Sequence, residues 1–147
     1  MASAYGSGGT IAVAADTGLT VIGGTTVKAR IDYILASCSG TPADATIDIS
    51  VQQFTADGTG TAVTPEPLDV DDRVALCASK KTYSAEPTYA GINVLDLGFN
   101  QRSVFQWYAQ PNGELVSSKA AGDGYGMRVD AFSTGTPTVQ FIAHWKE

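Results

Sequence analysis

"TPTVQFIAHWKE", residues 136–147, alternates between apolar and polar side chains along most of its length. One face carries Val139, Phe141, Ala143 and Trp145, and the other carries Gln140, Ile142, His144 and Lys146. A repeat of two residues is the spacing of a β-strand, because successive side chains of a strand point to opposite faces of its sheet. We therefore predict a strand here that buries Trp145 and leaves His144 on the more polar face.

Three further segments show the same alternation: "VKARIDYIL" (27–35), "TIDISVQQF" (46–54) and "GMRVDAF" (126–132). The side chains that share the apolar faces are Val27, Ala29, Ile31, Tyr33 and Leu35 in the first segment, Ile47, Ile49 and Val51 in the second, and Met127, Val129 and Ala131 in the third. Each segment is typical of a half-buried strand, with one face on a core and the other toward water.

Turn residues separate these segments and several less regular strand candidates. The clearest turn is "QPNGEL" (110–115), because Asn112-Gly113 can take the positive φ angles of a tight hairpin turn. It predicts a hairpin that joins "VFQWYA" (104–109) to "ELVSS" (114–118). Helical periodicity is absent, apart from a single turn near "DVDDRVAL" (69–76). The pattern predicts an all-β fold: an antiparallel β-sandwich or barrel, with a jelly-roll-like sandwich as the leading topology.

The first ten residues, "MASAYGSGGT", are small, polar and rich in glycine. We interpret residues 1–10 as a flexible, extended N-terminal arm, and residues 11–147 as a single β-sandwich domain. The start of the chain has neither a basic segment nor a sustained apolar run, so no signal peptide is expected. No stretch approaches the length of a membrane span, which predicts a protein that stays in the compartment where it is made.

The chain has a net charge of −6, and its nine basic residues are scattered. Nucleic-acid binding needs a basic stripe that displaces counterions from phosphates, so no nucleic-acid partner is expected. Asp69, Asp71 and Asp72 are the densest acidic cluster. They lack the glycine and glutamate spacing of a calcium loop, and a solvated turn is the favoured interpretation over a cation site.

His144 is the only histidine, and Cys38 and Cys77 are the only cysteines. The alternation favours a surface or interface role for His144 rather than a catalytic one. The cysteines have no metal-binding spacing and are predicted to be small buried hydrophobes rather than a disulfide. A catalytic pair of one cysteine with His144 stays open, although no local motif supports it.

No catalytic motif of a known class is present, so no enzymatic activity and no cofactor are expected. Among the aromatic residues, Phe105 and Trp107 share a face of their strand candidate, which also contains Tyr108 and follows Phe99. Core packing is the favoured use of this cluster, and a sugar-binding platform or an oligomer interface is the alternative.

Three segments, "YSAEPTYAGINVLDLGFN" (83–100), "VFQWYAQPNGEL" (104–115) and "GDGYGMRVDAFSTGTPTVQFIAHWKE" (122–147), occur in an order that resembles capsid cement, or decoration, proteins of tailed bacteriophages. The resemblance is carried by Ala85–Thr88, Trp107–Gly113, Gly124–Val129 and Phe141–Glu147. Residues 24–53 fit the opening strands of that family more loosely. The two cysteines and the "HWKE" ending depart from the pattern.

The resemblance implies a structural protein that stabilises the expanded icosahedral shell by bridging subunits of the major capsid protein. It implies a protein that is made in the cytoplasm of the bacterial host and lies on the outer surface of the virion as a homo-oligomer. A trimer is favoured, and a dimer is the competitor. The arm is the candidate contact with the shell or with a neighbouring copy, through Ala2, Ser3, Tyr5, Ser7 and Thr10.

Two other classes of function stay open on the sequence. One is a carbohydrate- or receptor-binding sandwich module of a phage fibre or tail. The other is a small hydrolase whose pair of carboxylates no motif reveals.

Overall fold

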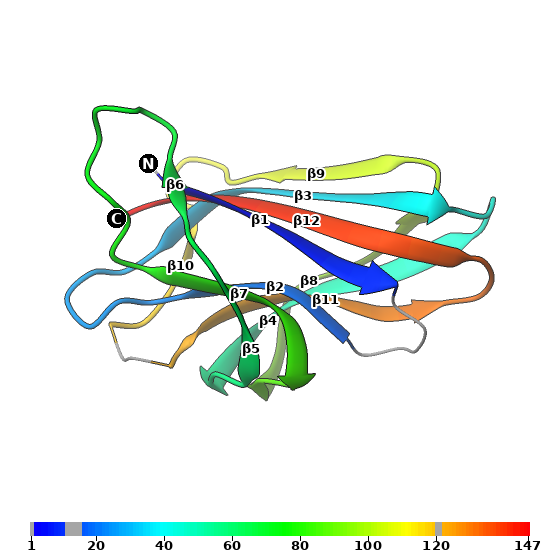
Figure 1. Ribbon diagram of the computed structural model, residues 1–147, viewed down its shortest axis with the longest axis horizontal. Helices are drawn as coiled ribbons and strands as arrows, with labels where there is room; N and C mark the ends of the chain where they lie inside the picture. Colours follow the sequence, from blue (N-terminus) through cyan, green and yellow to red (C-terminus); the bar gives the residue numbers. More distant parts are fainter. Residues whose placement is uncertain (1, 11–15, 120–121) are drawn as a thin grey trace.

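The computed structural model describes residues 2–10, 16–119 and 122–147, with residues 2–10 described by their backbone. Two six-stranded sheets, antiparallel throughout, lie face to face as two layers (Figure 1). The described residues contain no helix, and the segment near residues 69–76 forms turns and bends. The predicted all-β, antiparallel sandwich is confirmed, and the jelly-roll order of its strands stays a prediction.

The first sheet has the order β10-β3-β12-β1-β6, and β9 pairs with β3 as well. Its strands are β1 (Ala2–Thr10), β3 (Arg30–Thr41), β6 (Glu66–Pro67), β9 (Val104–Tyr108), β10 (Leu115–Val116) and β12 (Thr136–Lys146). The second sheet has the order β5-β7-β2-β11-β4-β8. Its strands are β2 (Asp16–Ile22), β4 (Thr46–Ala56), β5 (Thr59–Val63), β7 (Ala78–Ala85), β8 (Thr88–Asn100) and β11 (Gly124–Phe132).

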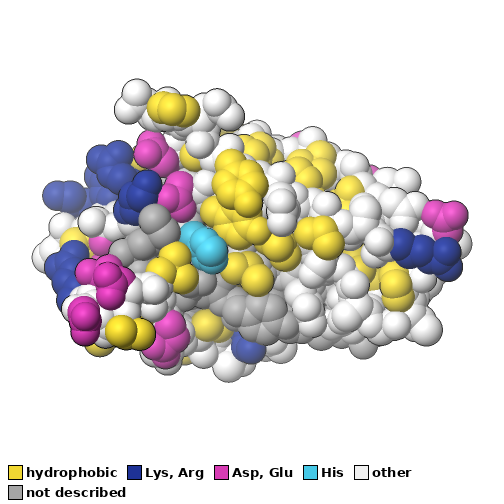
Figure 2. All heavy atoms as spheres, turned by 90° about the horizontal axis from the view of Figure 1, so that it is seen from above, with side chains coloured by type: hydrophobic (Ala, Val, Ile, Leu, Met, Phe, Trp, Pro, Cys, Tyr) yellow, Lys and Arg dark blue, Asp and Glu magenta, His cyan; other side chains and the backbone are white. Residues whose placement is uncertain are grey.

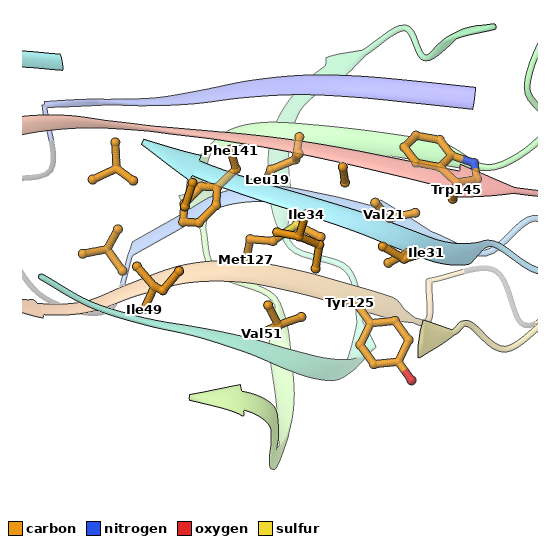
Figure 3. Close-up of a cluster of buried hydrophobic side chains, with 14 of the residues drawn as sticks. Leu19, Val21, Ile31, Ile34, Ile49, Val51, Tyr125, Met127, Phe141 and Trp145 are labelled. Atoms are coloured by element: carbon orange, nitrogen blue, oxygen red, sulfur yellow. The ribbon is translucent and has the colours of Figure 1, made fainter. Parts of the chain in front are cut away.

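The core lies between the two sheets and is built from the alternation that the sequence shows (Figure 3). In β12 the four residues predicted to face inward are fully buried: Val139, Phe141, Ala143 and Trp145. The inward side chains of β4 are buried as well: Ile47, Ile49 and Val51. Removal of this apolar surface from water is the main force that holds the two layers together.

A β-bulge in β3 changes which side chains face the core. His144 pairs with Tyr33, but the next residue, Trp145, pairs with Ile31, so Asp32 is an extra residue in β3. An extra residue shifts the alternation by one, and every side chain beyond it changes face. Ile31 and Ile34 are buried, whereas Tyr33 is only partly buried. The prediction that Tyr33 and Leu35 share the inward face of Ile31 is therefore wrong.

A second irregularity in β11 acts in the same way. The register shifts between Val129 and Ala131, and Asp130 has no partner on β4. Ala131 is exposed and Phe132 packs against the core in its place. The predicted inward orientation of Ala131 is wrong for this reason, while Met127 and Val129 are buried as expected.

The predicted hairpin between residues 104–109 and 114–118 does not form. Strand β9 pairs with residues 33–37 of β3, and β10 pairs with residues 30–31 of the same strand. The two strands therefore follow one another along one edge of β3, and residues 109–114 leave that edge between them. Asn112 does take a positive φ of 64°, so the turn forms, but it does not join two paired strands.

The residues expected to form an extended arm are described from Ala2 to Thr10 as strand β1, and Met1 lies outside the described residues. The backbone of β1 pairs with β12 along most of its length, and Ala2 and Ser3 also pair with β6. The segment thus lies in the first sheet beside the last strand of the chain (Figure 1).

Candidate functional site

Three aromatic rings form a row across the outer face of the first sheet. The strand register places His144 of β12 opposite Tyr33 of β3, and Tyr33 opposite Tyr108 of β9. The ring centroid of Tyr33 lies 4.8 Å from that of Tyr108 and 4.8 Å from that of His144. The two flanking rings are tilted by 42° and 43° to the Tyr33 ring. At these distances the rings lie against one another, and we call the three of them the aromatic row.

The aromatic row lines an open groove with a volume of about 590 Å³. The segment of residues 109–114, which connects β9 to β10, forms the rim of the groove. It contributes Gln110, Pro111 and Glu114. This connecting segment begins beside the bulge, because its first residue, Ala109, donates a 2.9 Å hydrogen bond from its amide to the Asp32 carbonyl. The bulge thus turns Tyr33 outward and also marks where the edge strand leaves the sheet.

Charged groups border one side of the aromatic row. The Lys146 ammonium lies 3.0 Å from the Asp32 carboxylate, and Glu114 lines the groove as well. Figure 2 shows the single histidine with a band of hydrophobic side chains on one side and charged side chains on the other. Partial burial lowers the pKa of His144 from its usual value of 6.5, although the Asp32 charge acts in the opposite direction. The imidazole is therefore neutral at pH 7.

The sequence predicted part of this arrangement. His144 lies on the outer face of β12 as expected, and Phe105 and Trp107 pack against the core as expected. Tyr108, next to them, is 61% exposed and belongs to the groove instead. The partnership of Tyr33, Tyr108 and His144 was missed, because it depends on the register of three strands that lie far apart in the sequence.

A second exposed surface lies at the end of the molecule that carries both ends of the described chain (Figure 1). The loop between β6 and β7 presents four large aliphatic side chains to water: Leu68, Val70, Val74 and Leu76, which are 50%, 92%, 70% and 51% exposed. We call these four residues the loop patch. Single exposed aliphatic residues are ordinary, and four within one loop make this loop a candidate contact surface.

Glu147 anchors the base of this loop. Its carboxylate accepts hydrogen bonds from the Leu76 amide at 2.9 Å and from the Cys77 amide at 2.8 Å. Arg73 lies 3.8 Å from the same carboxylate, and the Glu147 side chain is only 8% exposed. Burial would raise the pKa of this carboxyl, but the hydrogen bonds from the Cys77 and Leu76 amides outweigh burial and lower it below its usual 4.5.

We expect Glu147→Gln to lower the free energy of unfolding at pH 7 by about 1–2 kcal/mol, because an amide replaces a charged acceptor of two backbone hydrogen bonds. The folded pKa lies below the unfolded one, so the contribution of Glu147 is complete above about pH 4.5 and is lost as pH falls through the folded pKa. Urea unfolding at pH 7 and at pH 3 measures this. The exposed Glu66→Gln is the control. A gap between wild type and Glu147→Gln that stays constant with pH contradicts the assignment.

The predicted contact residues of the arm lie on β1, and their side chains are outside what the structure describes. By backbone pairing, Ala2 lies opposite Pro67 and Ser3 lies opposite Glu66, at the start of the loop that bears the loop patch. Tyr5, Ser7 and Thr10 follow along β1, where they pair with β12. The structure thus brings the first two of these residues near the loop patch and places the other three farther along the sheet.

The cysteines and the acidic cluster that the sequence singled out lie in different parts of the structure. Cys38 and Cys77 are both free thiols. Cys77 is buried as predicted, whereas Cys38 is only half-buried, and burial raises the pKa of the Cys77 thiol to about 11. Asp69, Asp71 and Asp72 are exposed, and the Asp69 carboxylate accepts a 3.1 Å hydrogen bond from the Asp71 amide. That exposure agrees with the predicted solvated turn. In the described part of the chain, no three His, Cys, Asp or Glu side chains are grouped so that they could hold a metal ion.

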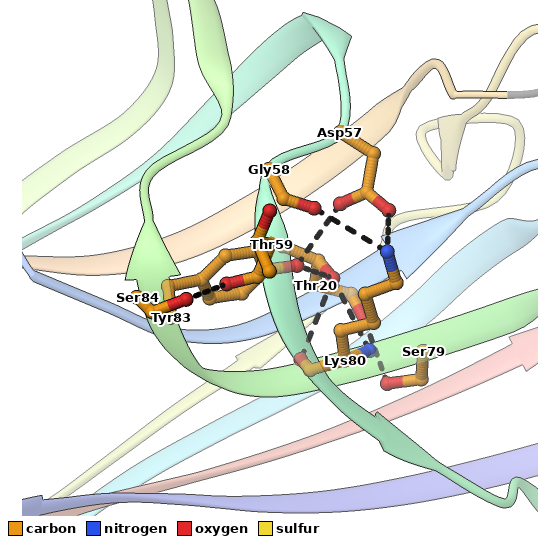
Figure 4. A network of polar contacts seen from close by, with 8 residues as sticks. All are labelled: Thr20, Asp57, Gly58, Thr59, Ser79, Lys80, Tyr83 and Ser84. Carbon is orange, nitrogen blue, oxygen red and sulfur yellow. Dashed lines mark hydrogen bonds and ion pairs between the residues drawn. The ribbon is translucent and has the colours of Figure 1, made fainter.

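A polar network at the edge of the second sheet has a structural role (Figure 4). The Lys80 ammonium lies 2.5 Å from the Asp57 carboxylate, and the Tyr83 hydroxyl donates a 3.2 Å hydrogen bond to Asp57. Thr20 lies 2.6 Å from the Tyr83 hydroxyl, and the Ser79 hydroxyl donates to the Thr20 carbonyl. These contacts join the turn after β4 to β7 and β2. Burial raises the pKa of the Tyr83 phenol, so it is neutral at pH 7.

Across residues 2–10, 16–119 and 122–147, no helix has the length and apolar character needed to cross a membrane. The chain was also compared with protein-family models, with curated proteins and with solved structures, and none of the three comparisons found a match.

Proposed function

We propose that this chain is a capsid cement, or decoration, protein: a structural, non-enzymatic protein that binds the outer surface of an icosahedral bacteriophage head and bridges subunits of the major capsid protein. The observation that carries the proposal is the loop patch. A protein that works by adhesion needs an exposed apolar surface that another protein can cover, and the loop patch is such a surface.

The position of the loop patch supports this role. β6, which leads into the loop, pairs with Ala2 and Ser3 of the expected arm, and Glu147 holds the other end of the loop. Residues from the start, the middle and the end of the chain therefore meet at one end of the sandwich. In the proposed complex, this end faces the shell.

Oligomeric assembly would give such a contact its strength. Each copy needs only modest affinity, because linked copies on a repeating lattice bind with an effective concentration that raises the overall avidity. We favour a homotrimer at threefold or quasi-threefold positions of the shell, with a dimer at twofold positions as the alternative. The protein would be made in the cytoplasm of the bacterial host and carried on the outside of the virion.

The test is to mix the purified protein with expanded capsid shells that lack it, and to image the shells by cryo-electron microscopy. We expect density at every equivalent joint between capsid subunits. The variant Val70→Asp/Val74→Asp should lower shell affinity about tenfold or more, because each carboxylate would have to lose its water in the contact. Both side chains are largely exposed, so the variant should fold normally.

Ile92→Asp is the matched control, since Ile92 is an aliphatic residue of β8 that is 57% exposed and lies on the second sheet. It should bind shells as the unmodified protein does. Shells that stay bare at saturating protein would exclude the cement role. If the Val70→Asp/Val74→Asp variant gives the same density on the shell as the unmodified protein, the contact does not involve the loop patch.

A further inference from the structure

The groove beside the aromatic row is separate from the loop patch and has the chemistry of a small-ligand site. Such sites combine an apolar, usually aromatic floor with a few polar groups that set the orientation of the ligand. Here the floor is the aromatic row, and the polar groups are two carboxylates, one ammonium and one amide: Asp32, Glu114, Lys146 and Gln110.

Tyr33, the middle ring of the aromatic row, is placed outward by the bulge at Asp32. A regular β3 would turn Tyr33 into the core with Ile31, as the alternation of the sequence predicts. Bulges occur often beside functional sites, where they redirect a side chain. The bulge here places Tyr33 on the outer face, where its ring is only partly buried and forgoes part of the stabilisation that the core would give.

We propose that this groove binds a neutral carbohydrate, with the apolar C–H face of a pyranose ring stacked on the exposed ring of Tyr108. Sugar hydroxyls would donate hydrogen bonds to the carboxylates of Asp32 and Glu114, and accept them from Lys146. The Gln110 amide can do either.

The spacing of the rings favours a stacked ligand over an inserted one. A ring that enters between two aromatic side chains needs them about 7 Å apart, twice the contact distance of carbon atoms. The centroids of Tyr33 and Tyr108 are 4.8 Å apart, so no slot for a proline ring exists between them. At that distance and tilt the two rings lie against each other, so a sugar can stack only on a ring face that no neighbouring ring covers. Tyr108, at the end of the row and 61% exposed, offers such a face. The groove therefore fits a carbohydrate better than a proline-rich peptide.

The charges disfavour an anionic ligand, and the ion pair of Lys146 with Asp32 disfavours a cationic one at that carboxylate. Two carboxylates and one ammonium give the rim a net charge of −1, counted as −1 for Asp32, −1 for Glu114 and +1 for Lys146. An anionic ligand would meet both carboxylates. A cationic ligand would compete with Lys146, which already lies 3.0 Å from Asp32. His144 adds no charge at pH 7, because burial lowers its pKa.

The experiment measures binding of cellotetraose, maltotetraose and chitotetraose by saturation-transfer NMR, and of a wider set of neutral glycans on an array. Decaproline serves as the peptide probe. We expect at least one neutral glycan to bind and decaproline to give no signal. Tyr108→Ala should reduce glycan binding about tenfold or more, since it removes one stacking surface. Tyr108→Phe, which keeps the ring, should stay within about threefold of the unmodified protein.

Val104→Ala is the matched control, because Val104 lies on the same strand, is 56% exposed and does not line the groove. It should leave binding unchanged. Tyr33→Ala gives a second readout, and a thermal melt shows whether it folds. Silence of all glycans at millimolar concentration, binding of decaproline alone, or glycan binding that survives both tyrosine-to-alanine variants would overturn the proposal. None of these outcomes bears on shell binding, which the loop-patch variants test.

Discussion

Replacing Trp145 by alanine will lower the free energy of unfolding by about 3–5 kcal/mol, the largest loss that we expect from any single substitution. Trp145 lies in β12 at the centre of the first sheet and is fully buried against the core (Figure 3). The substitution removes the apolar contacts of the indole and leaves a cavity that the neighbouring strands can fill only in part.

Urea unfolding at pH 7 measures this loss. Ile142→Ala is the control, because Ile142 lies on the same strand but on its outer face and is only partly buried. We expect it to cost under about 1.5 kcal/mol. Trp145→Phe, which keeps an aromatic ring, should lose less than Trp145→Ala. Equal losses for Trp145→Ala and Ile142→Ala would contradict the packing that the structure gives to β12.

Replacing Gly124 by alanine should lower the free energy of unfolding by about 3 kcal/mol, at the upper end of the usual cost of overpacking. Gly124 begins β11, where it pairs with Ile22 on one side and with Phe54 on the other. A methyl group there would overlap the Val21 carbonyl oxygen and lie 2.8 Å from the Phe54 ring. The strand ladder between β2 and β11 would have to open to make room.

The control is Gly91→Ala, which separates steric overlap from backbone strain. A methyl group at Gly91 has no neighbour within 4 Å, but the residue has a φ of +74°, which disfavours a side chain. We expect a cost of about 1 kcal/mol there, from strain alone. Thermal melts of both variants compare the two effects. A Gly124→Ala protein as stable as Gly91→Ala would show that the ladder adjusts more easily than the structure implies.

The inward faces of β12 and β4 could be predicted from the sequence because both strands are regular where they cross the core. The face of β4 that was expected to lie toward water is wrong in part, since Ser50 and Gln52 are buried. His144 and Trp145 fall on the faces that the period of two assigns to them. The period fails at Asp32 and Asp130, where one extra residue reverses the faces that follow. A bulge leaves little trace in a single sequence. The one signal in β3 is that Ile34 and Ala36 are apolar as well as Tyr33 and Leu35, so either face of the strand could have been the buried one.

The groove could not be predicted for a related reason. Asn112-Gly113 predicts a turn, and the turn exists, but local chemistry does not decide which strand the residues beyond a turn will pair with. β10 pairs with β3 rather than with β9, and this pairing opens the rim of the groove. The aromatic row then depends on the register of β9, β3 and β12, which is a property of the folded sheet. The loop patch leaves a clearer trace in the sequence, since "LDVDDRVAL" (68–76) places four aliphatic residues around an acidic turn.

The pairing of β1 with β12 has a consequence for how the chain folds. This contact at the centre of the first sheet joins residues 2–10 to residues 136–146, so it closes a loop that is nearly as long as the described chain. Contacts between distant residues slow folding, because the entropy of loop closure is lost before the contact is gained. On the ribosome, β1 and β3 emerge long before β12, the strand that lies between them. Until β12 arrives, the edges that they will share with it stay unpaired and open to other chains, so the newly made protein is prone to aggregation until β12 inserts.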